Sequence, residues 1–288
     1  MTALVRHRDV HYAGRLLARA AGNVRLVFGA LGAWYVRVRP NEVFGGIPGG
    51  DCERWSLGEQ PAGFVRLSLV PYHLALPDVA GRSVVDAGTA EGWGAALFAR
   101  HARCVVAFDA SAGAIAIARA RYPLPNLRFD VHDATQPFPV APRSADVVFS
   151  SEVIEHVRDG RAFVRAAAEA LNDDGLLIVK TPNDAYNRLE NRLNPHHVNP
   201  YTVARLRAEL EAQFAEVEIQ GLTYRQRLES AVEERPAGGA PESLPWRPND
   251  PIAIDRVLVT RLVVTPERVD PPRGVPEFLL ARARRPRR

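Results

Sequence analysis

A short apolar strand followed by an acid, a loop of small residues and a helix constrains this chain most. Residues 84–94 read VVDAGTAEGWG, and a second apolar strand closes with Asp109. Small residues let the backbone of such a loop approach a ligand, and the helix N-terminus points free N–H groups at it. An acid at the end of the next strand can accept hydrogen bonds from both ribose hydroxyls. The pattern therefore predicts an α/β fold with a nucleoside pocket.

The loop departs from the dinucleotide-binding fingerprint G-x-G-x-x-G. Ala90 stands where the second glycine belongs, between Gly88 and Gly92. Asp86 would also repel a pyrophosphate, whereas S-adenosylmethionine (SAM) has no phosphate and carries a sulfonium and an ammonium. The charges therefore favour SAM over NAD. A nicotinamide-dependent oxidoreductase and a turn without any ligand remain as alternatives.

Strands and helices alternate through the middle of the chain, which indicates a mostly parallel, doubly wound sheet with helices on both faces. In such folds, ligands bind at the carboxyl ends of the strands. Strands are expected at 83–86, 104–109, 127–132, 145–150, 176–181, 217–219, 252–264 and 278–283. Helices are expected at 62–76, 92–100, 112–121, 153–171 and 202–214.

The first 58 residues precede this alternation. Residues 10–36 predict one or two helices, and a loop rich in glycine and proline follows them. We expect residues 1–58 to form a helical extension or lid, and residues 59–288 to form the main domain. Within that domain, residues 232–252 are rich in Pro, Gly and Glu and predict a surface loop.

Composition limits the compartment and the partners. Cys52 and Cys104 form no disulfide framework or zinc motif, which suits a reducing cytoplasm, and Cys104 lies in an apolar strand that favours burial. All but one of the 37 basic side chains are arginine, the exception being Lys180. The net charge of +4 is modest and no aromatic residues accompany the arginines, so neither DNA nor RNA is expected as a partner. No uncharged apolar run reaches the ~20 residues that span a bilayer, so no stable membrane insertion is expected.

Two more polar positions follow predicted strands. Asp133 comes after the third strand with Ala134 beside it, and Ser150 ends the fourth. A carboxylate at the first position can accept a hydrogen bond from an adenine amino group. The alternative for Asp133 is an ordinary turn aspartate.

The segment after the fourth strand reads SEVIEHV over residues 151–157. If a helix begins near Glu152, then Glu152, Glu155 and His156 share one face at i, i+3 and i+4. Two carboxylates and an imidazole on one face need a cation, a proton or solvent. His197 lies in a loop after the fifth strand, and neighbouring strands would bring that loop within reach.

Three interpretations of this group remain open. His156 or His197 acts as a general base, since the pKa of histidine lies near working pH. Alternatively, Glu152, Glu155, His156 and His197 hold a divalent metal such as Mg²⁺, which would bind acceptor oxygens and lower their pKa. The third interpretation is that these residues are structural or solvated.

Taken in order, these motifs resemble the class I SAM-dependent methyltransferases, in particular the ubiquinone-type O-methyltransferases. The resemblance covers about residues 53–225. Residues 86–92 are similar to the first motif, D-x-G-x-G-x-G, from which Ala90 departs, and residues 150–157 are similar to the fourth. The resemblance implies a Rossmann-like, seven-stranded, mostly parallel sheet. It also implies a SAM site formed by Asp86, Gly88, Ala90, Gly92, Asp109, Ala110, Asp133, Ala134 and Ser150.

The resemblance further implies a reaction. A methyl group would pass from SAM to a hydroxyl of a small molecule, such as a sugar, a glycan or a natural-product intermediate, with a histidine as base. The same two glutamates and two histidines also resemble the ligands of metal-dependent small-RNA 2′-O-methyltransferases, which is an alternative. A protein that binds the cofactor without catalysis is another.

Overall fold

The computed structural model describes residues 62–186, 191, 194–222, 266–268 and 276–287. Contacts divide the chain into two compact units, one of residues 1–55 with 189–197 and one of residues 56–188 with 198–288. The fold below is that of the second unit. The predicted N-terminal helices, the domain boundary after residue 58, the loop at 232–252 and the strand at 252–264 lie outside the described residues.

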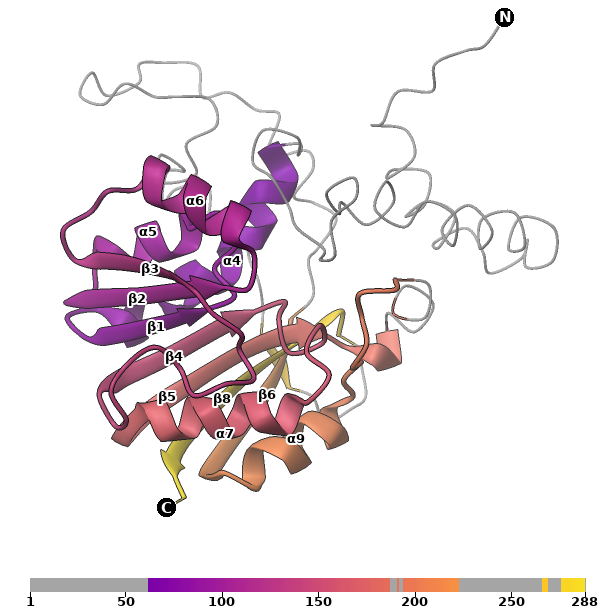
Figure 1. Cartoon of the computed structure of the whole chain (residues 1–288). Coiled ribbons are helices and arrows are strands. Elements are labelled where there is room, and N and C mark those ends of the chain that lie inside the picture. The colour runs from indigo at the N-terminus through magenta and orange to yellow at the C-terminus, as the bar shows by residue number, and fades with distance from the viewer. Residues whose placement is uncertain (1–61, 187–190, 192–193, 223–265, 269–275, 288) are drawn as a thin grey trace, which may run out of the picture. The chain divides into compact units, whose positions relative to one another are not determined.

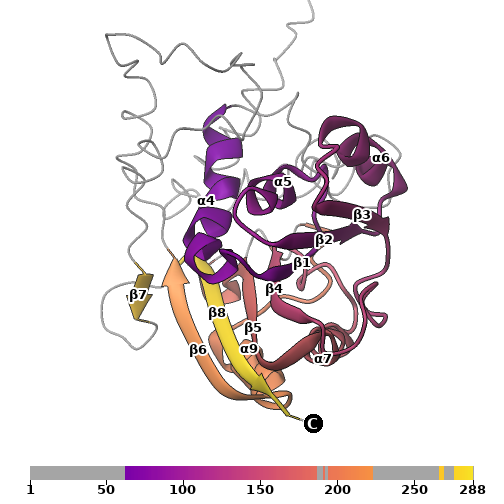
Figure 2. The ribbon, with the colours of Figure 1, turned by 90° about the vertical axis from the view of Figure 1, so that its left-hand side faces the viewer.

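The described strands form one mixed sheet in the order β3-β2-β1-β4-β5-β8-β6-β7 (Figure 1). β1 to β5 pair in parallel, and β8 runs antiparallel between β5 and β6 (Figure 2). The predicted seven-stranded, mostly parallel sheet is thus confirmed, and the three-residue β7 adds to its edge. The strands are β1 Ser83–Ala87, β2 Cys104–Asp109, β3 Leu127–Val131, β4 Ala145–Ser151, β5 Leu171–Pro182, β6 Phe214–Leu222, β7 Pro266–Arg268 and β8 Phe278–Pro286.

Side-chain caps fix where three of the helices begin. Ser111, Asp159 and Thr202 each accept a hydrogen bond from the backbone N–H three residues later, which stabilises a helix by about 1 kcal/mol. The described helices are α4 Ala62–Val79, α5 Trp93–Ala99, α6 Ala112–Arg121, α7 Gly160–Ala170 and α9 Val203–Glu211.

The prediction of a helix over residues 153–171 is wrong at its start, because α7 begins at Gly160. Residues 152–158 form bends and a turn, Glu152 has a left-handed backbone (φ 58°), and the cap at Asp159 sets the first helical turn. Glu152, Glu155 and His156 therefore do not share a helical face. Their arrangement depends on tertiary partners instead.

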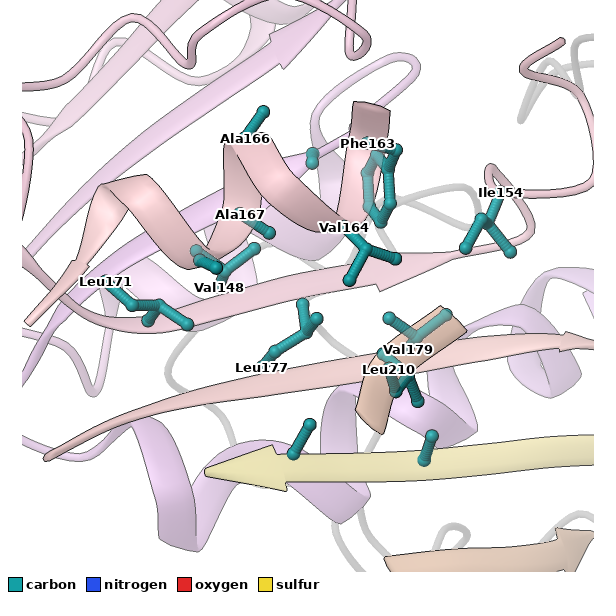
Figure 3. Close-up of a cluster of buried hydrophobic side chains, with 14 of the residues drawn as sticks. Val148, Ile154, Phe163, Val164, Ala166, Ala167, Leu171, Leu177, Val179 and Leu210 are labelled. Atoms are coloured by element: carbon teal, nitrogen blue, oxygen red, sulfur yellow. The ribbon is translucent and has the colours of Figure 1, made fainter. Parts of the chain in front are cut away.

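Two apolar clusters cover the two faces of the sheet. In β5, Leu177 and Val179 belong to the cluster that contains residues of α7 and α9 (Figure 3), whereas Leu176 and Ile178 belong to the cluster with α4, α5 and α6. Successive strand residues point to opposite faces, so β5 is buried on both. This confirms the doubly wound architecture, in which ligands bind at the carboxyl ends of the strands.

The structure also bears on the expected burial of Cys104 and on the search for membrane-spanning helices. Cys104 is exposed rather than buried, because it is the first residue of β2 and the burial of that strand begins at Val105. Within the described part of the chain, no helix is long and apolar enough to cross a membrane.

Candidate active site

Three predicted acids gather at the carboxyl edge of the sheet. Asp86 is the penultimate residue of β1, Asp109 ends β2, and Asp133 follows β3. The register pairs Asp86 with Ala107 and Asp109 with Val131, which places the ends of these strands side by side. These acids therefore lie along one edge of the sheet.

Asp86 is fully buried and is held by two hydroxyl groups. Thr89 Oγ1 donates to Asp86 Oδ2 at 2.7 Å, and the phenol of Tyr72 donates to Oδ1 at 3.3 Å. Burial raises the pKa of Asp86 to about 7, although the hydrogen bonds from Thr89 and Tyr72 lower it. A cation that enters beside this carboxyl would favour its ionised form.

Tyr72 is a residue that sequence reasoning missed. It lies in α4, and burial followed by the nearby charge of Asp86 raises the pKa of its phenol. Its ring packs against Trp93 and Phe149, and a Cβ at Gly94 would lie 2.1 Å from it. No local motif links a tyrosine to an acid fourteen residues later in the next element, so only the fold reveals the contact.

The loop after β1 has left-handed backbone at three alternate residues. Gly88, Ala90 and Gly92 have φ values of 81°, 48° and 80°. For a residue with a Cβ this conformation costs roughly 1–2 kcal/mol, so Ala90 adopts a glycine-like backbone at a cost. The N–H of Ala90 donates to Asp109 Oδ2 at 2.9 Å, which ties the loop to the end of β2.

Asp109 also accepts the N–H of Ser111 at 2.8 Å, through Oδ1. Each of its two carboxylate oxygens thus has one backbone donor. An ionised carboxylate has about four acceptor positions, so the side chain retains capacity for a pair of hydroxyl groups. The predicted ribose role fits this geometry, and Ala110 lies exposed beside it.

Asp133 forms a turn of its own. Its Oδ1 accepts both the N–H and the hydroxyl of Thr135 at 2.8 Å, and its side chain is exposed next to the buried Ala134. This is the bonding of an ordinary turn aspartate. The adenine role of Asp133 stays a prediction.

The segment after β4 meets the end of β5. Glu152 forms an ion pair with Lys180, and the N–H of Glu152 donates to the Lys180 carbonyl at 2.9 Å. Glu155 is buried, and Thr181 donates to its Oε2 at 2.9 Å. The ammonium of Lys180 lies 3.6 Å from the centre of the Phe278 ring. Sequence reasoning missed Lys180 and Thr181, whose partners lie 28 and 26 residues away along the chain.

Glu155 and His156 form the second part of this group. His156 Nε2 lies 4.0 Å from Glu155 Oε1, an oxygen without a hydrogen-bond partner among the described residues. Burial, and then the charge of Glu152, raise the pKa of Glu155 well above its ordinary value. The side chain of His156 is 26% exposed, so solvent and solutes can reach it while Glu155 is covered.

His197 belongs to the other compact unit. There its Nδ1 lies 2.8 Å from Asn191 Oδ1, and its N–H donates to the carbonyl of Asn194. Its predicted place beside Glu155 and His156, as a base or as a metal ligand, stays a prediction.

Residues 64–217 match the family model described as a methyltransferase domain. The chain belongs to this family. Over 207 residues it is also 35% identical to a protein of Mycobacterium tuberculosis named a probable SAM-dependent methyltransferase, covering 66% of this chain and 72% of that protein. A ubiquinone biosynthesis O-methyltransferase of Azorhizobium caulinodans is 32% identical over 126 residues, 42% of this chain and 50% of that protein.

Two solved structures share the fold of this methyltransferase. One is N-methyltransferase NodS of Bradyrhizobium japonicum in complex with S-adenosyl-L-homocysteine (TM-score 0.51, 18% identity, 83% of this chain and 94% of that one). The other is a Haloferax volcanii methyltransferase in complex with the Trm112 activator (TM-score 0.53, 17% identity, 78% and 93%). The family match and the named relatives show that the chain is a SAM-dependent methyltransferase, so SAM is its cofactor and the oxidoreductase alternative is wrong.

The residues at the carboxyl edge fit SAM. Ser150 is fully buried at the end of β4, and no described residue bonds its hydroxyl. A Cβ at Gly88 would lie 2.2 Å from Val153, so only glycine fits this close approach of the loop to the segment after β4. The buried acid at Asp86 suits a cationic ligand rather than a phosphate. The methyltransferase thus has a buried acid that suits the positive charge of the cofactor.

Proposed function

We propose that this methyltransferase methylates a hydroxyl of a small-molecule acceptor that binds over the carboxyl ends of β4 and β5, with His156 as general base. The observation that carries the proposal is the pairing of His156 with Glu155. A partly exposed imidazole beside a buried carboxyl can take a proton, because the imidazolium that forms favours the ionised form of Glu155 and the two opposite charges then stabilise each other. A hydroxyl acceptor needs such a base, whereas a neutral amine does not.

The cofactor end of the site is assigned by the same reasoning. Asp86 and the loop of Gly88 to Gly92 would hold the methionine portion of SAM, Asp109 the ribose, and Asp133 with Ala134 the adenine. Ser150 and Ala110 complete the proposed contacts. When bound, SAM supplies an electrophilic methyl group on its sulfonium.

The protein's own contribution is then positioning and proton removal. Holding donor and acceptor in line supplies much of the rate, because the methyl donor is already activated. The turn over residues 152–158 follows β4 and carries His156. Strand β1, which carries Asp86 near its end, is the neighbour of β4 in the sheet. His156 would accept the hydroxyl proton as the methyl group transfers.

The acceptor class rests on weaker support. The relatives named ubiquinone biosynthesis O-methyltransferases favour transfer to oxygen. The family resemblance of the sequence implies a sugar, a glycan or a natural-product intermediate as the acceptor.

Replacing His156 tests the proposal directly. Activity is measured on a panel of acceptors that contains phenols, sugars, aliphatic alcohols and amines. Methyl transfer is followed with SAM labelled in the methyl group. His156→Ala should lower kcat about 10²- to 10⁴-fold, the usual range for losing a general base, while calorimetry shows unchanged SAM affinity. His101→Ala is the matched control, because His101 lies just before β2 at the opposite edge of the sheet.

Two outcomes would contradict the proposal. One is full activity of His156→Ala with a hydroxyl acceptor. The other is methylation of amines alone, since an amine acceptor leaves no role for the base.

A further inference from the structure

Lys180 is the only lysine in a chain with 37 basic residues. It lies near the end of β5, and only 4% of the residue is exposed. Lysine is rarely buried unless it is paired. In a chain that otherwise uses arginine for positive charge, the one lysine therefore occupies a position with a specific requirement.

The surroundings of Lys180 explain what is required. Its ammonium pairs with Glu152 on one side and lies over the Phe278 ring on the other, 3.6 Å from the ring centre. A backbone hydrogen bond joins the same two residues, since the N–H of Glu152 donates to the Lys180 carbonyl. A compact ammonium fits between a carboxylate and a ring, whereas a planar guanidinium is larger and spreads its donors over a fork.

Glu152 reaches Lys180 only through an uncommon backbone. Its φ of 58° is left-handed, which costs a residue with a Cβ roughly 1–2 kcal/mol. The ion pair and the backbone hydrogen bond to β5 stabilise this conformation. The same turn carries Glu155 and His156, so the link to Lys180 fixes where that pair lies.

We propose that Lys180 is the resident cation of the acceptor end, and that its ion pair with Glu152 withholds that carboxylate from the divalent metal site that the sequence predicts. The inference deepens the proposed hydroxyl methylation, whose acceptor would meet a site of low net charge rather than a bare acidic pocket. Glu152 is already neutralised by an ammonium that the fold supplies. Glu152 therefore needs no added metal to balance its charge.

The proposal predicts a gain of metal binding when Lys180 is removed. Lys180→Met leaves Glu152 without its ammonium, three and four residues before Glu155 and His156. This set of oxygen and nitrogen ligands suits several divalent ions, including Mn²⁺. Mn²⁺ affinity, measured by electron paramagnetic resonance without cofactor or acceptor, should be at least about tenfold higher for Lys180→Met than for the wild type.

Three further variants complete the comparison. Lys180→Arg keeps the charge and should bind Mn²⁺ no better than the wild type. Lys180→Met with Glu152→Gln removes both partners and should lose the gained binding. Arg128→Met is the matched control, because Arg128 belongs to an exposed ion pair with Asp130 on β3.

A second measurement needs no variant. In protein made with isotope-labelled lysine, the single lysine gives one side-chain ammonium signal. Millimolar Mn²⁺ should leave that signal unbroadened, because no paramagnetic ion sits beside Lys180.

The outcomes separate the two proposals. Wild-type Mn²⁺ binding that broadens the lysine signal, or that is lost in His197→Ala, overturns the role of Lys180 and supports the metal site. Failure of Lys180→Met to gain metal overturns it too, provided circular dichroism shows that the variant is folded. None of these readouts depends on the acceptor or on His156 as base, so they remain valid if the hydroxyl proposal fails.

Discussion

The cofactor end and the acceptor end of the site are built by different kinds of contact. At the cofactor end, each acid has a partner two or three residues away along the chain, as Asp109 has Ser111 and Asp133 has Thr135, and longer-range bonds add to these local ones. At the acceptor end, Glu152 and Glu155 bond residues 28 and 26 positions later, on β5. Local sequence motifs therefore indicate much of the cofactor end, whereas the acceptor end forms only when strands β4 and β5 pair.

Among the substitutions that test this difference between the two ends, Asp109→Ala should have the largest effect, on SAM affinity. Asp109→Ala takes away the acceptor for the Ala90 and Ser111 N–H groups and the proposed ribose contact. We expect SAM affinity to fall about 100-fold, since hydrogen bonds to a charged group are worth about 1.5–3 kcal/mol. Calorimetric titration measures it, with Asp130→Ala on β3 as the control. A change of less than threefold or so would break the assignment of the cofactor end.

The acceptor end should respond in stability rather than in cofactor affinity. Glu152→Gln leaves the Lys180 ammonium covered without its carboxylate. We expect the free energy of unfolding to fall by about 2 kcal/mol, below the 3–5 kcal/mol of fully buried pairs, because the Glu152 side chain is 37% exposed. Urea unfolding measures the loss, and Glu152→Gln with Lys180→Met should restore most of it. If the double variant is no more stable than the single one, the pair is not the origin of the effect.

We expect cofactor binding to depend on pH through Asp86. Its pKa is raised to about 7 in the folded protein, so below pH 7 the carboxyl must release a proton before it can face the methionine ammonium. S-adenosylhomocysteine should therefore bind about tenfold more weakly at pH 6 than at pH 8. Asp86→Asn should remove this dependence. A wild-type affinity that is flat over the window would mean that Asp86 does not face the cationic part of the ligand.

The raised pKa of Asp86 also affects the stability of the unliganded protein. Stability falls as pH rises, whereas cofactor affinity increases. A carboxyl whose pKa is raised on folding stabilises the fold below its unfolded value of 3.8, and the contribution is lost as pH rises through about 7. Without ligand, wild type should thus lose stability relative to Asp86→Asn between pH 4 and 8. Binding and stability measured together show whether the cofactor offsets this loss.

The smallest effect concerns the loop itself. Ala90→Gly should raise the free energy of unfolding by about 0.5–1 kcal/mol, because glycine has no Cβ penalty at φ 48° and loses only part of that gain in chain entropy. Thermal unfolding measures it. Ala87→Gly in β1 is the control and should destabilise, since a strand residue gains nothing from glycine. A destabilised Ala90→Gly would contradict the argument from backbone strain.

Most of the fold could be predicted from sequence, because each strand carries its own apolar run. The expected strand 104–109 and helix 112–121 coincide with β2 and α6. The start of α7 could not, because the pattern EVIEHV suits a helix locally. The left-handed backbone of Glu152, which pairs with Lys180, and the cap at Asp159 override that preference in the folded chain.

The sequence by itself determined the order of strands and helices, the glycine-like loop, and the acids that follow β1, β2 and β3. These are properties of neighbouring residues, since a strand end and a turn need few partners beyond their own segment. Only the tertiary structure decided that Tyr72 bonds Asp86 and that Lys180 is the cation beside Glu152. The physical reason is burial. Charged and phenolic groups far apart in the chain find partners only where packing removes them from water, and a single sequence does not record which segments will meet there.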